Sequence, residues 1–376
     1  MITSPLCSVE ESIDTLLNDF LEQMTQQVEF NAGYSENLAF DYSRLWHFLR
    51  YNINNAGDPF IYDKFVKSHA KEFEQKSLQW FAQLYELQNH WGYVTTGGSE
   101  GNIYGLFLGR ERYPDSVFYA SKDSHYSIVK AARLLRIPYT PIDSQLNGEI
   151  DYDQLERELS AHRHQSAILN LNLGTTMKGA IDRIERVVDI LKRVNITQFH
   201  LHCDAALGGM LLPFIDSAPK ISFQDYPIGS IAVSGHKFIG SPIHFGIVLT
   251  RREYVQKIGK RIEYLGTDDT TITGSRCGLN ALFLWYAIAT RGQKFAREVV
   301  TCLENAQYLR DRLQQIGYNP LLNDFSITVA FKKPPAKVCD KWQLAIEGNL
   351  AHVVVMQHIS TQKINELIDD LLQAQA

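Results

Sequence analysis

Cysteines are few in this sequence, and their spacing matches no known framework. Only five occur in 376 residues, at positions 7, 203, 277, 302 and 339, and no two are separated by just two residues. An odd number of widely spaced thiols argues against a disulfide scaffold and against a zinc ribbon, so we expect no metal site. Scattered thiols are typical of proteins in a reducing compartment, and we therefore expect a cytoplasmic protein.

The sequence also lacks an excess of basic charge and a long apolar run. It has 37 Lys and Arg against 42 Asp and Glu, a net charge of −5. Nucleic-acid-binding proteins usually carry a basic excess, so we expect no nucleic acid partner. No run of 18 apolar residues occurs, which predicts no membrane-spanning helix and no membrane partner. The first 17 residues contain acidic but no basic side chains, unlike a secretory signal or a transit peptide.

The composition is that of a packed globular protein. Hydrophobic residues make up 45% of the chain and aromatic residues 11%, which excludes disorder for the bulk of it. A chain of this length corresponds to two or three domains on the usual size scale. It can bury large cores without disulfide or metal cross-links.

The N-terminal part, residues 1–70, is predicted to be a helix followed by an arm. Residues 9–30 carry apolar side chains at helical spacing, and residues 31–63 are rich in loop-forming residues. An enclosing arm of this kind packs on a partner subunit in many proteins, and a plain surface loop is the alternative.

Residues 71–285 alternate between helices and short apolar strands and are predicted to form a large domain. This alternation predicts a mostly parallel sheet with helices on both faces. In such sheets ligands bind beyond the carboxyl ends of the strands. The predicted strands are 117–120, 167–173, 199–203, 230–233 and 246–250, and helices are predicted at 103–110, 123–135 and 182–193.

Residues 286–376 show a different pattern and are predicted to form a smaller α+β domain. A helix is expected over 296–316, because its apolar residues have helical spacing and Gly317 can end it. Two strands, 325–331 and 351–357, and a final helix, 360–374, follow.

A glycine-rich segment at residues 95–102 (TTGGSEGN) runs directly into a predicted helix. Glycines allow the backbone to approach an anion closely, and a helix N-terminus offers free N–H groups. This arrangement suits a phosphate, although the segment lacks the Gly-Lys-Ser/Thr ending of a Walker loop. On its own, such a helix start is more often purely structural.

Three further polar residues stand at the ends of predicted strands. His125 belongs either to a helix cap or to a ligand crevice. Asp204 ends an apolar strand, either as a structural acceptor or as the partner of a protonated cofactor nitrogen. Lys237 follows another apolar strand within a Gly/Ser turn, and a buried lysine has a lowered pKa and can form a Schiff base. Cys203 alternates to the other face of its strand, which favours the core.

Taken together, these four signals fit one cofactor. A phosphate-binding loop, a histidine that can stack on a ring, an acid for a pyridine nitrogen and a Schiff-base lysine are the set that pyridoxal phosphate requires. The sequence therefore predicts a pyridoxal-phosphate enzyme.

The sequence resembles the pyridoxal-phosphate-dependent group II amino-acid decarboxylases, in particular the bacterial histidine and plant serine decarboxylases. The resemblance extends from Gly33 to Leu372. It implies an α/β, aspartate-aminotransferase-like fold (pyridoxal-phosphate fold type I) and a homodimer with active sites at the subunit interface. The matching segments are 33–34 (GY), 40–42 (FDY), 53–55 (INN), 91–93 (WGY), 172–176 (NLGTT), 179–182 (GAID), 234–237 (SGHK) and 273–276 (TGSR).

The resemblance also implies roles for single residues. Lys237 looks like the lysine that binds the cofactor covalently, Asp204 like the acid that keeps the ring nitrogen protonated, and His125 like the residue stacked on the ring. These three are the predicted catalytic residues. The other implied cofactor contacts are backbone N–H groups of Ser99 and Glu100 for the phosphate, Ser234 and His236 beside it, Thr175 or Thr176 near the ring substituents, Ala206 under the ring, and Ser275, reaching the phosphate from the other subunit.

The identity of the amino-acid substrate is left open between serine, giving ethanolamine, and histidine, giving histamine. Residues 30–34 (FNAGY) are similar to the histidine enzymes, whereas residues 54–61, 342–345 and 351–356 favour the serine branch slightly. Aromatic amino acids fit less well, because the resemblance to their decarboxylases is more distant. Two other hypotheses remain, a different pyridoxal-phosphate lyase on the same fold and an inactive scaffold relative.

Overall fold

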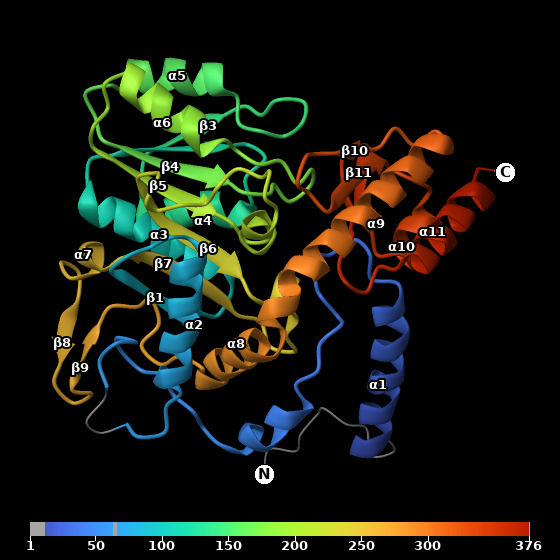
Figure 1. Cartoon of the computed structure of the whole chain (residues 1–376), viewed down its shortest axis with the longest axis horizontal. Coiled ribbons are helices and arrows are strands. Elements are labelled where there is room, and N and C mark those ends of the chain that lie inside the picture. Colours follow the sequence, from blue (N-terminus) through green and yellow to red (C-terminus); the bar gives the residue numbers. More distant parts are fainter. Residues whose placement is uncertain (1–11, 63–65, 376) are drawn as a thin grey trace, which may run out of the picture.

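A seven-stranded sheet forms the centre of the larger part of the chain (Figure 1). The computed structural model describes residues 12–62 and 66–375. The strands lie in the order β1-β7-β6-β5-β4-β2-β3. Their bounds are β1 His90–Thr95, β2 Val117–Ser121, β3 Tyr139–Ile142, β4 Ala167–Asn172, β5 Phe199–Asp204, β6 Ile228–Ser234 and β7 Gly246–Arg251.

This sheet is mostly parallel, as the sequence predicts. Strands β2 to β6 run parallel, and β7 is antiparallel to both of its neighbours, β1 and β6. Every residue of β2, β4 and β6 is buried, which is why these segments show continuous apolar runs rather than alternation. All five predicted strands are confirmed to within two residues at each end, whereas β1 and β3 are not among the predictions.

Helices cover both faces of this sheet. α3 (Gly98–Arg112) packs on β5, β6 and β7 beside α4 (Tyr126–Leu135), and α2 (Lys71–Leu84) packs on β1 beside α8 (Gly278–Arg291). α5 (Tyr152–Ala161) and α6 (Ile184–Arg193) pack on each other. The predicted helices 103–110, 123–135 and 182–193 correspond to α3, α4 and α6. Because the strands are parallel, the carboxyl ends of β2, β4, β5 and β6 meet at one edge of the sheet.

A smaller antiparallel sheet follows, in the order β10-β11-β13-β12. Its elements are β10 Leu321–Leu322, β11 Thr328–Lys332, β12 Ala345–Glu347 and β13 Leu350–Val354, with α9 Phe295–Gln315, α10 Ala336–Lys341 and α11 Thr361–Gln373. The predicted elements of this region are confirmed apart from small shifts at their ends. The predicted boundary between residues 285 and 286 falls inside α8, and the division into domains stays a proposal.

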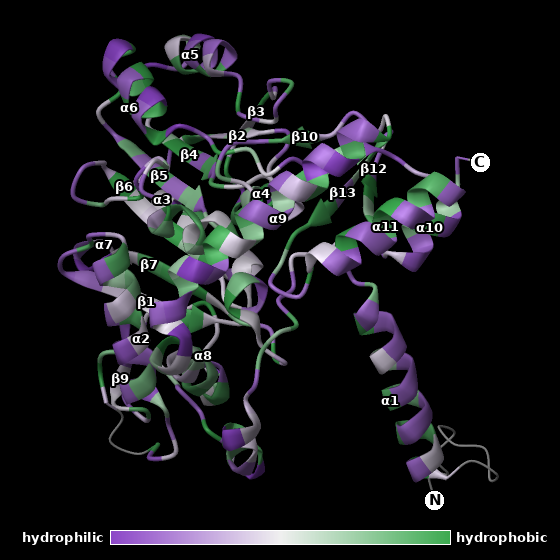
Figure 2. Cartoon of the chain, turned by 45° about the vertical axis from the view of Figure 1, so that its right-hand side comes forward, coloured by the Kyte–Doolittle hydropathy of each residue, from purple (hydrophilic) through white to green (hydrophobic). Residues whose placement is uncertain are grey.

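The N-terminal helix α1 (Ile13–Glu29) stands apart from both sheets (Figure 2). Ser12 caps it by accepting a hydrogen bond from the Thr15 N–H at 3.1 Å. None of its residues is buried in this chain. Residues 9–11 of the predicted helix lie outside the described residues. The predicted loop after it contains a 3₁₀ helix, η1 (Ser43–Arg50).

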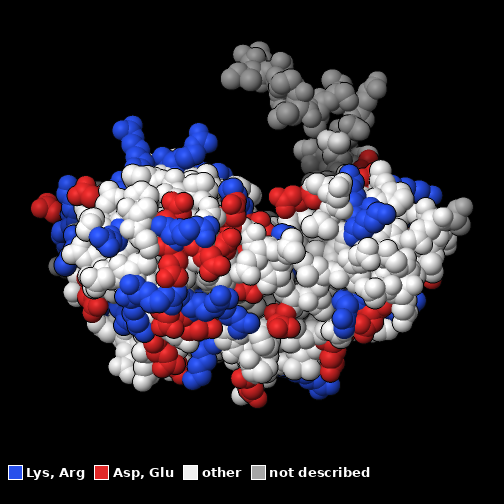
Figure 3. All heavy atoms as spheres, turned by 90° about the horizontal axis from the view of Figure 1, so that it is seen from above, with Lys and Arg blue, Asp and Glu red and all other residues white. Residues whose placement is uncertain are grey.

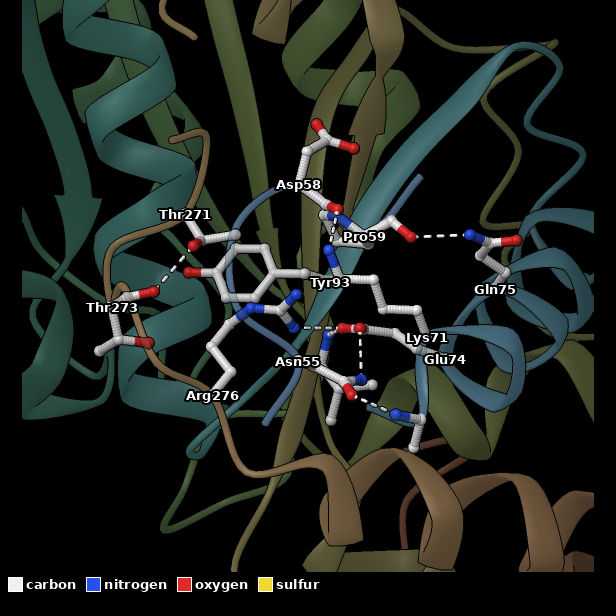
Figure 4. A network of polar contacts seen from close by, with 12 residues as sticks. Asn55, Asp58, Pro59, Lys71, Glu74, Gln75, Tyr93, Thr271, Thr273 and Arg276 are labelled. Carbon is white, nitrogen blue, oxygen red and sulfur yellow. Dashed lines mark hydrogen bonds and ion pairs between the residues drawn. The ribbon is translucent and has the colours of Figure 1, made fainter. Parts of the chain in front are cut away.

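A buried polar network joins the segment after η1 to α2 and to the loop before α8 (Figure 4). The Glu74 carboxylate, on α2, accepts hydrogen bonds from the Val94 N–H and the Asn55 amide, both at 2.8 Å, and forms an ion pair with Arg276. Arg276 also donates to the Gly57 carbonyl at 3.1 Å. This network fixes the loop that carries Ser275 against the large sheet.

Acidic and basic side chains are interspersed on the face seen in Figure 3. Ion pairs at the surface of the chain include Arg193 of α6 with Glu156 of α5, at 2.6 Å. Among the residues the structure describes, no helix has the length and apolar character needed to span a bilayer.

Candidate active site

A cavity of about 270 Å³ opens where the strand ends of the large sheet face the small sheet. Loops after β2, β4, β5 and β6, the start of α3, the N-terminal arm and the small sheet all contribute to its wall. It is lined by Gly33, Tyr34, Ser35, Gly98, Ser99, Asn102, His125, Tyr126, Asn172, Gly174, Thr175, Thr176, Asp204, Ala206, Leu207, Ser234, His236, Lys237, Thr328, Ala345, His352 and Val354.

One wall of the cavity is the N-terminus of α3. The first N–H groups of a helix have no partner within the helix, so those of Gly98, Ser99 and Glu100 are available to an anion. A Cβ atom at Gly98 would lie 2.4 Å from the Ser234 hydroxyl oxygen, so only glycine allows this close approach. The Glu100 carboxylate turns away from the cavity and accepts hydrogen bonds from the backbone N–H and hydroxyl of Thr96, at 2.8 and 2.7 Å.

Lys237 lies in a π-helical turn, η4 (His236–Gly240), directly after β6. The carbonyl oxygens of residues 237–240 accept hydrogen bonds of 2.6–3.3 Å from groups outside the turn. The donors are Asn37 and Tyr42 of the arm, Arg291 at the end of α8, and Gln357 after β13. The rare turn is therefore held in place by segments distant in sequence.

The environment of the Lys237 amine favours its uncharged form. Burial lowers the pKa of Lys237, and the carboxylate of Asp204 opposes part of this effect. Lys237 is the only lysine among the residues that line the cavity in the described part of the chain. A buried amine with a lowered pKa is a good nucleophile towards a carbonyl group.

Asp204 is the last residue of β5, and its two carboxylate oxygens have different partners. Oδ2 accepts a hydrogen bond from the Asn102 amide at 2.9 Å, and Oδ1 accepts one from the Ala206 N–H at 3.2 Å. Both donors fix the plane of the carboxylate at the cavity wall. Asn102 is a site residue that the sequence analysis did not single out, although it ends the glycine-rich segment.

His125 both caps a helix and lines the cavity. Its Nδ1 accepts from the N–H of Ser127, in the first turn of α4, at 3.3 Å, and lies 2.7 Å from the Ser127 hydroxyl. The two predicted roles of this residue, cap and crevice, are therefore compatible. Burial lowers the pKa of His125, which favours the neutral ring, and the Asp204 carboxylate opposes this. Tyr126 packs beside the ring at 4.1 Å between centroids.

His236 is held by its Nδ1, which lies 2.9 Å from the Phe245 carbonyl oxygen and must donate to it. Burial lowers the pKa of His236 to about 4. In the neutral ring, Nε2 therefore has no proton. It could donate to a phosphate only after protonation, which the negative charge of that phosphate would favour.

The loop after β4 places Thr175 and Thr176 on the cavity wall. Gly174 adopts a φ of +115°, a conformation open to glycine but rarely to other residues. The Thr175 hydroxyl accepts from the Ala180 N–H at 3.0 Å, which closes the loop on itself.

Most of the predicted site residues line this one cavity, and two do not. Glu100 offers the cavity only its backbone N–H, in the first turn of α3, because its side chain bonds to Thr96 instead. Ser275 is exposed in its own chain and accepts from the Asn54 amide at 3.2 Å. A residue that serves the site of a second subunit would lie outside its own cavity, so the role of Ser275 stays a prediction.

His352 and Tyr34 are cavity residues that the sequence analysis did not identify as site residues. His352, on β13, has Nε2 2.9 Å from the Gly33 carbonyl and Nδ1 3.2 Å from the Met177 carbonyl. It therefore links the small sheet, the arm and the large sheet. Neither residue has a local sequence signal, because each reaches the cavity from an element remote from the strand ends.

Residues 61–333 match the pyridoxal-dependent decarboxylase conserved domain. The chain belongs to this family. Membership makes it a pyridoxal-phosphate-dependent amino-acid decarboxylase, as the sequence analysis predicted.

Individual relatives of this decarboxylase include enzymes of two specificities. Serine decarboxylase 1 of rice, Oryza sativa subsp. japonica, is 42% identical over 98% of this chain and 77% of its own. A histidine decarboxylase of Morganella morganii is 43% identical over 95% of each chain. The solved structure of an L-methionine decarboxylase from Streptomyces sp.590 superposes with a TM-score of 0.88 at 24% identity, covering 96% and 95% of the two chains. This last likeness confirms the aspartate-aminotransferase-like fold.

The residues at the cavity fit pyridoxal 5'-phosphate. A buried amine, Lys237, is available for covalent attachment, and an oriented carboxylate, Asp204, is available for the ring nitrogen. The free N–H groups at the start of α3 and the Ser234 hydroxyl form a place for the phosphate. This decarboxylase therefore has, within its own chain, partners for the aldehyde, the ring nitrogen and the phosphate of the cofactor.

Proposed function

We propose that this decarboxylase converts a small polar L-amino acid to its amine, L-serine to ethanolamine or L-histidine to histamine. The observation that carries the proposal is the arrangement of Lys237, Asp204 and His125 around one cavity, at the ends of β6, β5 and β2. The relatives named above, serine and histidine decarboxylases at 42–43% identity over nearly the full chain, support the choice of substrates.

Each of these side chains has a distinct role in the proposal. When bound, the cofactor supplies a protonated pyridine ring that accepts the electron pair left by departing carbon dioxide. Lys237 would supply the amine for covalent attachment of the cofactor. Asp204 would hold a proton at the ring nitrogen by a charge-assisted hydrogen bond. His125 would lie against the ring and orient it.

The remaining predicted residues surround these three. Ser99, Glu100, Ser234 and His236 would hold the phosphate, Thr175 and Thr176 would lie beside the ring substituents, and Ala206 would leave room beneath the ring. The substrate side chain would be selected on the side of the cavity that the arm and the small sheet form. This side carries Tyr34, Ser35 and His352.

An amine screen tests the proposal and separates the two substrates. The purified protein with pyridoxal phosphate would receive histidine and serine separately, then the other standard amino acids as a mixture, and the amines would be identified by mass spectrometry. We expect ethanolamine or histamine to dominate, because two side chains of such different size and polarity cannot both fit one pocket well. An oxidised or aldehyde product would contradict decarboxylation and would support a different pyridoxal-phosphate lyase. A protein that takes up no cofactor would support the inactive scaffold.

We also propose that the protein is a homodimer in the cytoplasm, with the arm and α1 packed on the second subunit. α1 presents an apolar stripe, and Ile13, Leu17, Phe20 and Leu21 are each more than half exposed in the single chain. An apolar stripe of this size in water is unfavourable and marks a surface for association. The free thiols of the described cysteines support a reducing compartment.

Breaking the apolar stripe of α1 should weaken the dimer. We expect the double variant Leu17→Asp, Phe20→Asp to elute as a monomer, because two charges would be buried in an apolar interface. Light scattering coupled to size-exclusion chromatography measures the mass. The matched control is Gln26→Asp on the opposite side of the same helix, which should leave the dimer intact. A dimer that survives the double variant would show that α1 is not part of the interface.

A further inference from the structure

A line of buried polar side chains leads from Asp204 into the core beneath the sheet. The Asn102 amide donates to Asp204 Oδ2 at 2.9 Å, and Asn102 Oδ1 lies 3.0 Å from His202 Nε2. His202 Nδ1 lies 2.8 Å from the Ser230 hydroxyl. Asn102, His202 and Ser230 are at most 2% exposed, so the line is shielded from water.

The line continues to the C-terminal end of α3. The Ser230 hydroxyl lies 2.9 Å from His200 Nε2, and His200 Nδ1 lies 3.1 Å from the Arg112 guanidinium, at the end of α3. Arg112 in turn stacks on the ring of Tyr254, with 3.6 Å between the guanidinium carbon and the ring centroid. Five consecutive hydrogen bonds thus connect Arg112 to Asp204.

The chemistry of the two ends fixes the direction of every bond in this line. A guanidinium can only donate and an ionised carboxylate can only accept. His200 must therefore accept at Nδ1 and donate at Nε2 to Ser230, whose hydroxyl donates to His202. His202 then donates at Nε2 to Asn102, whose amide donates to Asp204. Working back from Asp204 gives the same assignment.

Asn102 is a branch point in this line. Its second N–H donates to the Ser127 hydroxyl at 3.0 Å, and that hydroxyl lies 2.7 Å from His125 Nδ1. Because His125 Nδ1 accepts from the Ser127 N–H, this nitrogen carries no proton, and the Ser127 hydroxyl must donate to it. One amide group therefore orients both the carboxylate and the imidazole that face the cofactor site.

Two glycines make room for the imidazoles. A Cβ atom at Gly105, in the middle of α3, would lie 2.1 Å from His202 Nδ1, and a Cβ atom at Gly229 would lie 2.5 Å from His200. Glycine weakens a helix interior, so its presence at position 105 serves this contact. Burial also lowers the pKa of His202 to about 4 and holds the pKa of His200 well below its usual range, which keeps both rings neutral, as the line requires.

We propose that His202 and Ser230 are positioning residues, which hold the Asn102 amide in the one orientation that serves Asp204 and His125 together. Neither residue touches the cavity. Their effect on the cofactor passes through Asn102. This inference rests on the proposed roles of Asp204 and His125 in cofactor binding.

Two amide substitutions at position 202 test the inference. A glutamine can place its nitrogen near the position of imidazole Nε2, whereas the shorter asparagine reaches only the position of Nδ1. We expect His202→Gln to retain most of the affinity for pyridoxal phosphate and His202→Asn to lose about tenfold, the size of one hydrogen bond in a charged network. The dissociation constant would be measured by quenching of protein fluorescence, and the visible spectrum of the bound cofactor would be titrated with pH.

A second variant interrupts the line without changing a histidine. Ser230→Ala removes the donor to His202 Nδ1, and we expect a several-fold loss of cofactor affinity and a shifted pH titration of the visible spectrum. Ser77→Ala is the matched control, because Ser77 is equally buried but its hydroxyl bonds only to the Phe73 carbonyl of its own helix. The control should leave both readouts unchanged.

The outcomes separate this inference from the proposed function. If the wild-type protein binds the cofactor but His202→Asn and Ser230→Ala match it in affinity and spectrum, the positioning role is wrong and the proposed function stands. If the wild-type protein binds no cofactor, both are wrong. Should His202→Asn fail to fold, Ser230→Ala alone decides between these outcomes.

Discussion

Replacing Lys237 with alanine is expected to abolish amine formation while leaving a folded protein that still takes up pyridoxal phosphate. The phosphate site at the start of α3 and the carboxylate of Asp204 remain intact, so affinity persists without the covalent link. No other lysine lines the cavity in the described residues, so none can replace it. We expect turnover to fall by on the order of 10³ to 10⁶, the range seen when a covalent catalyst is removed.

Borohydride reduction followed by peptide mass spectrometry checks this prediction directly. In the wild-type protein, the peptide that contains Lys237 should carry a reduced pyridoxyl group, and in Lys237→Ala no peptide should carry it. Lys237→Arg is the informative companion, because it keeps a positive charge but cannot act as a nucleophile, and it should be as inactive as the alanine variant. Turnover at the wild-type rate by Lys237→Ala would show that Lys237 is not the lysine that binds the cofactor covalently.

Replacing Arg276 with alanine is expected to lower the free energy of unfolding by about 3–5 kcal/mol. The Glu74 and Arg276 side chains are 0% and 3% exposed, so the variant would leave a buried carboxylate without its counter-charge. The hydrogen bonds from Val94 and Asn55 to Glu74 would compensate only in part. Urea unfolding at a fixed protein concentration measures the loss.

Helix α2, which carries Glu74, also provides the control for this prediction. Glu72 and Lys76 form an exposed i,i+4 ion pair on α2, and Lys76→Ala should leave the unfolding midpoint unchanged. Replacing both Glu74 and Arg276 with apolar residues of similar volume should restore part of the loss, because neither member of the pair would then remain as a buried charge without its partner. If Arg276→Ala were as stable as the wild type, the buried pair of Glu74 and Arg276 would not be what holds the Ser275 loop in place.

The sequence predicts the centre of the fold well because its strands are buried on both faces. Clusters of apolar residues in β4 and β6, and apolar residues at every second position of β5, identify these strands without reference to the rest of the chain. β1 escapes prediction because His90 and Gly92 interrupt its apolar pattern, and glycine is unfavourable inside a strand. β3 escapes it because Pro141 interrupts a strand at the sheet edge, where proline is tolerated.

The same distinction applies to the site. Lys237, Asp204 and His125 can be predicted because each follows its own apolar strand, and parallel strands bring their carboxyl ends together. His352 and Tyr34 cannot be predicted in this way, since they depend on how the small sheet and the arm are placed. The line of hydrogen bonds from Asp204 to Arg112 likewise cannot be predicted from the sequence. His200 and His202 alternate with apolar residues as in any half-polar strand, and only the structure shows which groups their rings contact.

The antiparallel strand β7 also has a consequence for the order of folding. Gly246 pairs with Thr95 on one side and with Ser234 on the other, so it joins the start of the phosphate site to the turn that carries Lys237. On the ribosome, β1 and α3 emerge long before Gly246, and β1 has no strand to pair with until then. Contacts between residues so distant in sequence form late and slowly. We therefore expect the cofactor site to be completed only after β7 has inserted, and a chain interrupted before Gly246 would leave β1 without its strand partner and open to aggregation.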